Sequence, residues 1–142
     1  MREVLDKALD NYGLKETVGK KHNPVIVKMF SDIGHGWVKN DELAWCAMIV
    51  NWWLKETGYE YTGKLNARSF LEIGEPVKIP EKGNLVIFWR INKHGPFGHV
   101  GLFIRETNNL IYVLGGNQNN KVCIKAYPKS QLLEYRKLKK RI

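Results

Sequence analysis

The sequence contains no long hydrophobic run, and its first residues do not have the pattern of a secretory leader. Its longest apolar stretch, 43–54, is interrupted by Asn51 and is shorter than a membrane span, which is typical of a buried helix. The first residues include the acidic Glu3 and Asp6, and no apolar segment with a small-residue cleavage site follows them. We therefore expect no secretory signal and a protein that is made in the cytoplasm.

The sequence is also poor in cysteine, with only Cys46 and Cys123. Two cysteines provide no disulfide framework, and the absence of a C-x-x-C spacing argues against a cysteine zinc site. No Asp-rich loop of the calcium-binding kind is present. We therefore expect neither a metal ion nor a cofactor. The one alternative is a zinc site that combines both cysteines with His94 and His99.

Acidic residues are few relative to basic ones. The chain has 14 Asp and Glu against 23 Lys and Arg, a net charge of +9. This balance favours a polyanionic partner, such as nucleic acid, an anionic membrane surface or the anionic polymers of a cell envelope, without choosing among them. The basic run 135–141 has two interpretations, a solvated chain end or a binding tail.

The order of apolar patterns predicts an α+β fold in one domain covering 1–142. Apolar residues at helical spacing precede Pro80, and short runs rich in Val, Ile, Phe and Tyr follow it, separated by turn-forming residues. This order is typical of N-terminal helices packed on a C-terminal antiparallel sheet, here of four to six strands. The expected helices are 3–12, one starting at Asn23-Pro24, 41–58 and 66–73; the expected strands are 84–90, 99–105, 110–114 and 122–127.

Cys46 lies near the start of the expected helix 41–58. Backbone N–H groups and the helix dipole stabilise a thiolate at such a position, which would make Cys46 a nucleophile. The alternative is a small core residue, since free cysteine is often buried.

A thiol nucleophile needs a base, and His99 is the best-placed histidine. It opens a strand expected to pack beside the helix, whereas His22, His35 and His94 lie in loops. Asn117 or Gln118, at the end of the next strand, supplies a side-chain oxygen that can accept a hydrogen bond from the imidazole. The same residues also suit a hairpin turn.

At these residues the sequence resembles the CHAP and NlpC/P60 superfamily of bacterial and phage peptidoglycan hydrolases, and within it a small phage- and bacteria-associated group. The resemblance implies a papain-like α+β fold and hydrolysis of amide bonds in peptidoglycan. Six short segments carry it in order, from about Gly13 to Tyr127: Gly19-Lys20-Lys21-His22-Asn23-Pro24, Asp41-Glu42-Leu43-Ala44-Trp45-Cys46-Ala47, Asn66-Ala67-Arg68-Ser69, Lys82-Gly83-Asn84-Leu85-Val86-Ile87-Phe88, Gly98-His99-Val100-Gly101 and Leu114-Gly115-Gly116-Asn117-Gln118.

The resemblance also implies roles for individual residues. It makes Cys46 the nucleophile, His99 the base and Asn117 the polar residue that orients the imidazole, with Gln118 as support. Many CHAP relatives have a glutamate shortly before that asparagine, where this chain has glycines. The Cys46 backbone N–H would stabilise the oxyanion, helped by Asn40 or Asp41. Asp41 has an alternative role as a helix N-cap.

Four further residues are candidates for substrate binding. Trp45, Trp89 and Phe97 would line the groove, and core positions are the alternative for Trp89 and Phe97. Arg68 would hold a substrate carboxylate, since arginine binds carboxylates bidentately, or would form a buried salt bridge.

The expected function is therefore hydrolysis of the stem peptide of peptidoglycan, by an endopeptidase or an N-acetylmuramoyl-L-alanine amidase. We expect a monomer whose basic surface contacts anionic wall polymers rather than nucleic acid, and which reaches the wall through phage lysis or a secretion system. Two alternatives remain: a papain-like enzyme that acts on proteins, such as a deamidase or toxin effector, and a non-catalytic module that binds polyanions.

Overall fold

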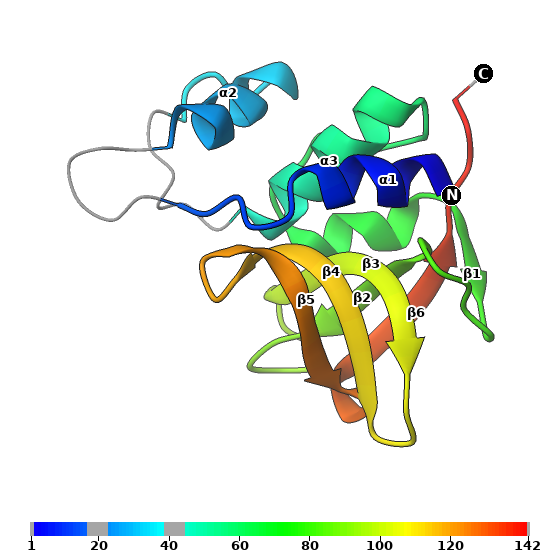
Figure 1. The fold of residues 1–142 in the computed structure, drawn as a ribbon. Helices are drawn as coiled ribbons and strands as arrows, with labels where there is room; N and C mark the ends of the chain where they lie inside the picture. Colours follow the sequence, from blue (N-terminus) through cyan, green and yellow to red (C-terminus); the bar gives the residue numbers. More distant parts are fainter. Residues whose placement is uncertain (1, 17–22, 39–44, 142) are drawn as a thin grey trace.

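The N-terminal helices lie along one side of a six-stranded antiparallel sheet (Figure 1). The computed structural model describes residues 2–16, 23–38 and 45–141. The strands follow the order β1-β6-β2-β3-β4-β5 across the sheet. The expected α+β fold, with helices first and four to six strands after them, is confirmed. The elements are α1 (Arg2–Asp10), α2 (Pro24–Asp32), α3 (Cys46–Thr57), the 3-10 helix η1 (Ala67–Glu72), β1 (Glu75–Val77), β2 (Leu85–Trp89), β3 (Gly98–Glu106), β4 (Leu110–Gln118), β5 (Lys121–Pro128), η2 (Lys129–Gln131) and β6 (Leu132–Lys137).

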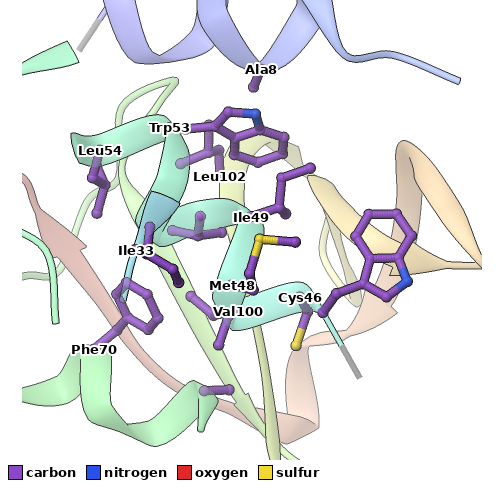
Figure 2. Packing of buried hydrophobic residues seen from close by; sticks show 14 of the residues in the cluster. Ala8, Ile33, Cys46, Met48, Ile49, Trp53, Leu54, Phe70, Val100 and Leu102 are labelled. Carbon is purple, nitrogen blue, oxygen red and sulfur yellow. The ribbon is translucent and has the colours of Figure 1, made fainter. Parts of the chain in front are cut away.

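Helix α3 is the centre of the main core. Its residues Met48, Ile49 and Trp53 are fully buried because α1 covers one side of the helix and the sheet covers another (Figure 2). Val100 and Leu102 of β3 belong to the same core cluster. The helix ends at Gly58, whose positive φ of 84° closes the C-terminus as the sequence predicts. This packing holds the first turn of α3 rigidly against β3.

The C-terminal basic run is part of the sheet. β6 pairs with both β1 and β2, and the interpretation of 135–141 as a solvated end is therefore wrong for its first residues. Arg136 is buried, and its guanidinium donates hydrogen bonds to the carbonyls of Ile73 and Gly74. Lys139 and Lys140 pair with Glu75 and Glu3 at 3.3 and 3.6 Å, so much of this positive charge is engaged within the fold.

The hairpin between β4 and β5 contains an irregularity that matters for the site. Gly115 pairs with Cys123, but Gln118 pairs with Lys121, so β4 carries one extra residue over this interval. Such a bulge reverses which side chains face inward. Asn117 lies within it at a φ of 55°, and the turn that follows consists of Asn119 and Asn120 at φ 53° and 64°. Positive φ at both turn residues is typical of the tight turns that join antiparallel strands.

No helix within the described ranges has the length and apolar character that crossing a membrane requires.

Candidate active site

Cys46 is the first residue of α3, and its side chain is nearly covered, with 7% exposed. Figure 2 shows it at the N-terminal end of the helix, with Val100 of β3 nearby. Burial raises the pKa of the Cys46 thiol, and the backbone groups of Val100 and Ala47 and the positive charge of Arg90 offset this only in part. The backbone groups at the helix start lower the pKa of the thiol, as expected, but burial outweighs them and the net shift favours the neutral thiol.

His99 is the second residue of β3 and immediately precedes Val100, which interacts with the cysteine. Its side chain is 3% exposed. The pKa of His99 is lowered to about 4, chiefly by burial and to a smaller extent by the charges of Arg90 and Lys125, while its hydrogen bond to Gln118 acts in the opposite direction. The imidazole is therefore neutral at neutral pH. Cys46 and His99 form no hydrogen bond with each other in the described chain, and such contacts are often loose without substrate.

Gln118 fixes the proton on the imidazole. Its side-chain Oε1 lies 2.9 Å from His99 Nε2. Its amide nitrogen donates to the carbonyls of Val113 and Cys123, at 3.1 and 2.6 Å. Both amide hydrogens are therefore engaged, and Oε1 faces the ring as an acceptor. His99 Nε2 must then carry the hydrogen, and Nδ1 keeps the lone pair that can accept a proton from a thiol.

Gln118, and not Asn117, makes the orienting contact, which corrects the assignment of that contact to Asn117. The bulge in β4 is the reason, because it turns the buried Gln118 toward His99 and leaves Asn117 at the edge of a surface hollow. Gly115 makes room for this arrangement, since a Cβ atom there would lie 2.6 Å from Gln118 Oε1. Gly115 thus accommodates the glutamine, whereas Gly116 makes room for Ile49 and Trp45.

Tyr127 of β5 is a site residue that the sequence analysis missed. Its ring stacks on the His99 ring with centroids 4.8 Å apart and an angle of 27° between the planes. Its hydroxyl oxygen lies 3.1 Å from His99 Nε2. Burial raises the pKa of Tyr127, so the phenol is uncharged. The imidazole is thus held in its plane by Gln118 and on one face by Tyr127. Nothing in the sequence distinguishes this tyrosine from the other five.

The structure separates the candidates for substrate binding. Trp45 is fully buried against α3 and β4, since a Cβ atom on Gly116 would lie 2.7 Å from its ring; it is a core residue and does not line a groove. Arg68 donates to the carbonyls of Asn92, Lys93 and Phe97, at 2.8, 2.8 and 3.0 Å. It therefore holds the β2–β3 loop and does not present its guanidinium to a substrate. Asn40 and Asp41 lie outside the described residues.

Two surface hollows flank Cys46 and His99. One, of about 360 Å³, is lined by His99, Trp89, Asn117 and Tyr127 among others. The other, of about 410 Å³, is lined by Cys46 and by Phe97, whose side chain is 58% exposed. Both volumes are in the range of small-molecule sites. Trp89 and Phe97 therefore each line a hollow beside these two residues, and their contact with a substrate stays a prediction.

The four residues of the alternative zinc site do not gather. Among the described residues no three His, Cys, Asp or Glu side chains are close enough to hold a metal ion. The Cys123 thiol instead donates to the carbonyl of Gln118 at 3.3 Å. Cys123 therefore supports the residue that orients His99.

Comparison with known proteins supports the fold. No family model matches the chain, and no curated protein matches it either. Six chains of solved structures match. One is the crystal structure of a protein from Staphylococcus aureus described as similar to lipoprotein and of the NLP/P60 family, with a TM-score of 0.55 and 16% sequence identity. The match covers 96% of this chain and 40% of that one. The chain thus shares the α+β fold of this neighbour and spans less than half of the neighbour's length.

Proposed function

We propose that this protein is a cysteine peptidase or amidase that cleaves amide bonds in the stem peptide of peptidoglycan. The observation that carries the proposal is the state of His99, whose Nε2 hydrogen is fixed on Gln118 so that Nδ1 is the free base. This base lies in a strand that packs against the helix carrying Cys46. The neighbour's NLP/P60 description supports the choice of the bacterial wall as the source of substrate.

In the proposed reaction both side chains start uncharged. The lowered pKa of His99 and the raised pKa of Cys46 favour the neutral thiol and imidazole, so the proton moves from Cys46 Sγ to His99 Nδ1 as the sulfur attacks the carbonyl carbon. The oxyanion forms near the start of α3, where the Cys46 N–H is a donor. The imidazolium then protonates the leaving amine, a thioester remains on Cys46, and water hydrolyses it with His99 again as base.

The orienting residue in this mechanism is an uncharged amide. An imidazolium formed during the reaction would keep donating its Nε2–H to Gln118 Oε1, and no carboxylate contacts the ring among the described residues. Hydrogen bonds from a charged donor are about twice as strong as neutral ones, so the Gln118 contact strengthens as the proton arrives. We expect the enzyme to function without a metal ion or cofactor, as a monomer that reaches the wall by release or delivery from the cell.

The test is digestion of purified sacculi by the wild-type protein, Cys46→Ala and Cys46→Ser, with soluble muropeptides identified by mass spectrometry. The wild type should release new muropeptides whose masses locate the cleaved bond and distinguish an endopeptidase from an amidase. Both variants should release none while keeping the wild-type circular dichroism spectrum. Equal release by Cys46→Ala, or no release by the wild type between pH 5 and 9, would overturn the proposal.

A further inference from the structure

The two hollows beside the reacting groups share one wall. Arg90 and Ile91, which follow β2, line both the hollow next to His99 and the hollow next to Cys46. A substrate bound across the site would therefore pass the Arg90 side chain within reach of both groups. The positive charge of Arg90 lowers the pKa of both Cys46 and His99, so it acts on both reacting groups.

The charge around these hollows has one sign. Arg90 and Lys125 line the hollow beside His99, and no Asp or Glu is among the described residues that line either hollow. The Lys125 ammonium lies 5.5 Å from the centroid of the Tyr127 ring, which itself stacks on His99. Concave surfaces lined by one sign of charge concentrate ligands of the opposite sign. The site therefore suits an anionic group.

The fold itself does not use the Arg90 guanidinium. Its side chain makes no hydrogen bond or ion pair with any described residue, whereas Arg68 donates to three backbone carbonyls and Arg136 donates to two carbonyls and pairs with Glu134. Lys125 likewise forms no ion pair within the described part of the chain, although Lys129 on the following turn pairs with Glu106 at 3.4 Å. Two cations without anionic partners thus face the same hollow.

The turn that presents Arg90 is held in an unfavourable conformation. Ile91 has a φ of 68°, which is rare for a β-branched residue. The backbone around it is fixed by hydrogen bonds from the Arg90 N–H to the Phe97 carbonyl and from the Asn92 N–H to the Arg90 carbonyl, at 3.1 and 2.7 Å. Arg68 donates hydrogen bonds to the Phe97 and Asn92 carbonyls of the same loop. Strained backbone that its surroundings enforce is concentrated at ligand-binding sites.

We propose that Arg90, assisted by Lys125, binds a free carboxylate on the substrate residue adjacent to the cleaved amide. This inference rests on the proposed function and narrows its substrates to peptides that carry a carboxylate at that position rather than a carboxamide. A guanidinium presents two parallel N–H donors to a carboxylate, and an ammonium adds a second positive charge. The carboxylate role expected for Arg68 is thereby assigned to a residue whose donors are available.

The test uses two synthetic stem peptides that differ only in a carboxylate or a carboxamide on the residue next to the scissile amide. Binding to Cys46→Ala is measured by calorimetry, and cleavage by the otherwise wild-type protein is measured by chromatography. Cys46→Ala should bind the carboxylate peptide about 10- to 100-fold more tightly than the carboxamide peptide. Arg90→Gln added to Cys46→Ala should remove most of this difference, and Lys125→Gln should remove part of it.

Two matched controls change equally exposed cations elsewhere. Arg105→Gln and Lys121→Gln alter side chains that line neither hollow and should leave the preference for the carboxylate peptide unchanged. All four substituted positions are exposed, so each variant should keep the melting temperature of its parent. Arg90→Lys should retain part of the preference, because it keeps the charge and loses the paired donors.

Equal affinity of Cys46→Ala for the two peptides would overturn the inference, and so would no measurable binding of either peptide. It would also be overturned if Arg90→Gln weakened the binding of both peptides by the same factor. Failure of the proposed function has a different signature. If the wild type cleaves both peptides equally well, the carboxylate subsite is wrong and the hydrolase stands. If Cys46→Ala binds with the expected preference but the wild type cleaves neither peptide nor sacculi, the subsite stands and the hydrolase proposal is wrong.

Discussion

Among the described residues, acidification should destabilise this protein through His99 before the carboxyl groups of Glu3 and Asp32 contribute. The folded-state pKa of His99 is about 4 against 6.5 for an unperturbed histidine, because the ring is buried. Between these two pH values the unfolded chain binds a proton at His99 that the folded protein does not bind. The stability that the neutral His99 contributes is therefore fully present above pH 6.5 and is lost as the pH falls toward 4. The difference of about 2.5 pKa units, at 1.36 kcal/mol each, corresponds to a loss of roughly 3 kcal/mol.

The pH window identifies the residue responsible. The carboxyl groups of Glu3 and Asp32 have lowered pKa values, about 2 for Glu3, so the stability they contribute is lost mainly as the pH falls below about 4.5. Among the described residues, urea denaturation at steps between pH 7 and 4.5 therefore reports mainly on His99. The wild type should lose more than 2 kcal/mol of unfolding free energy over this interval.

The matched variants are His99→Gln and His94→Gln. Glutamine at 99 retains an N–H donor for Gln118 and has no titrating ring, so its stability should stay nearly constant over the window. His94 is exposed, and its replacement should leave the wild-type loss in place. An imidazole NMR titration of His99 with a midpoint at or above 6.5, or a flat stability profile for the wild type, would refute the reasoning.

Three further predictions concern the same site. Gln118→Leu should lower kcat for muropeptide release about 10- to 100-fold, as loss of an orienting partner does elsewhere, while Asn117→Ala should change it little. Because the pKa of the Cys46 thiol is raised, iodoacetamide should modify it more slowly than free cysteine at pH 7. The rate should rise about tenfold per pH unit to beyond pH 9. A rate independent of pH between 5 and 7 would instead indicate a preformed ion pair with His99. Gly116→Ala should lower the unfolding free energy by about 1–3 kcal/mol in urea denaturation, because its Cβ would lie 2.6 Å from Ile49 and 2.7 Å from Trp45. A Cβ at Gly36 has room, so Gly36→Ala should leave the unfolding free energy nearly unchanged. Similar losses for the two variants would contradict this packing.

The sequence allows the positions of Cys46 and His99 to be predicted because both lie in strongly patterned segments. The apolar run around Cys46 indicates a central helix, and the run that begins at His99 indicates a buried strand. Their proximity then follows from packing the central helix on the sheet. By contrast, β6 is obscured by its lysines and arginines, and only the buried guanidinium of Arg136 and the pairing partners reveal it.

The details of the site depend on geometry that residue types do not encode. The exchange of Asn117 for Gln118 follows from one bulged residue, and strand alternation read from the sequence does not locate such a bulge. The roles of Arg68 and Arg90 are equally hidden, since the two arginines are chemically identical and differ only in which one the loop carbonyls reach. The sequence predicts that Trp45 lines the groove, and its burial against Gly116 shows it to be a core residue instead.

The two amide hydrogens of Gln118 make the orientation of His99 depend on the length of one hairpin. They hold the carbonyls of Val113 and Cys123 on adjacent strands, so the glutamine that selects the imidazole proton also joins β4 to β5. Removing or adding one residue in the bulge would reverse the inward and outward faces beyond it and withdraw the acceptor from His99. In directed evolution or loop grafting, segment 115–120 should therefore tolerate substitutions at Asn117 but no change in length.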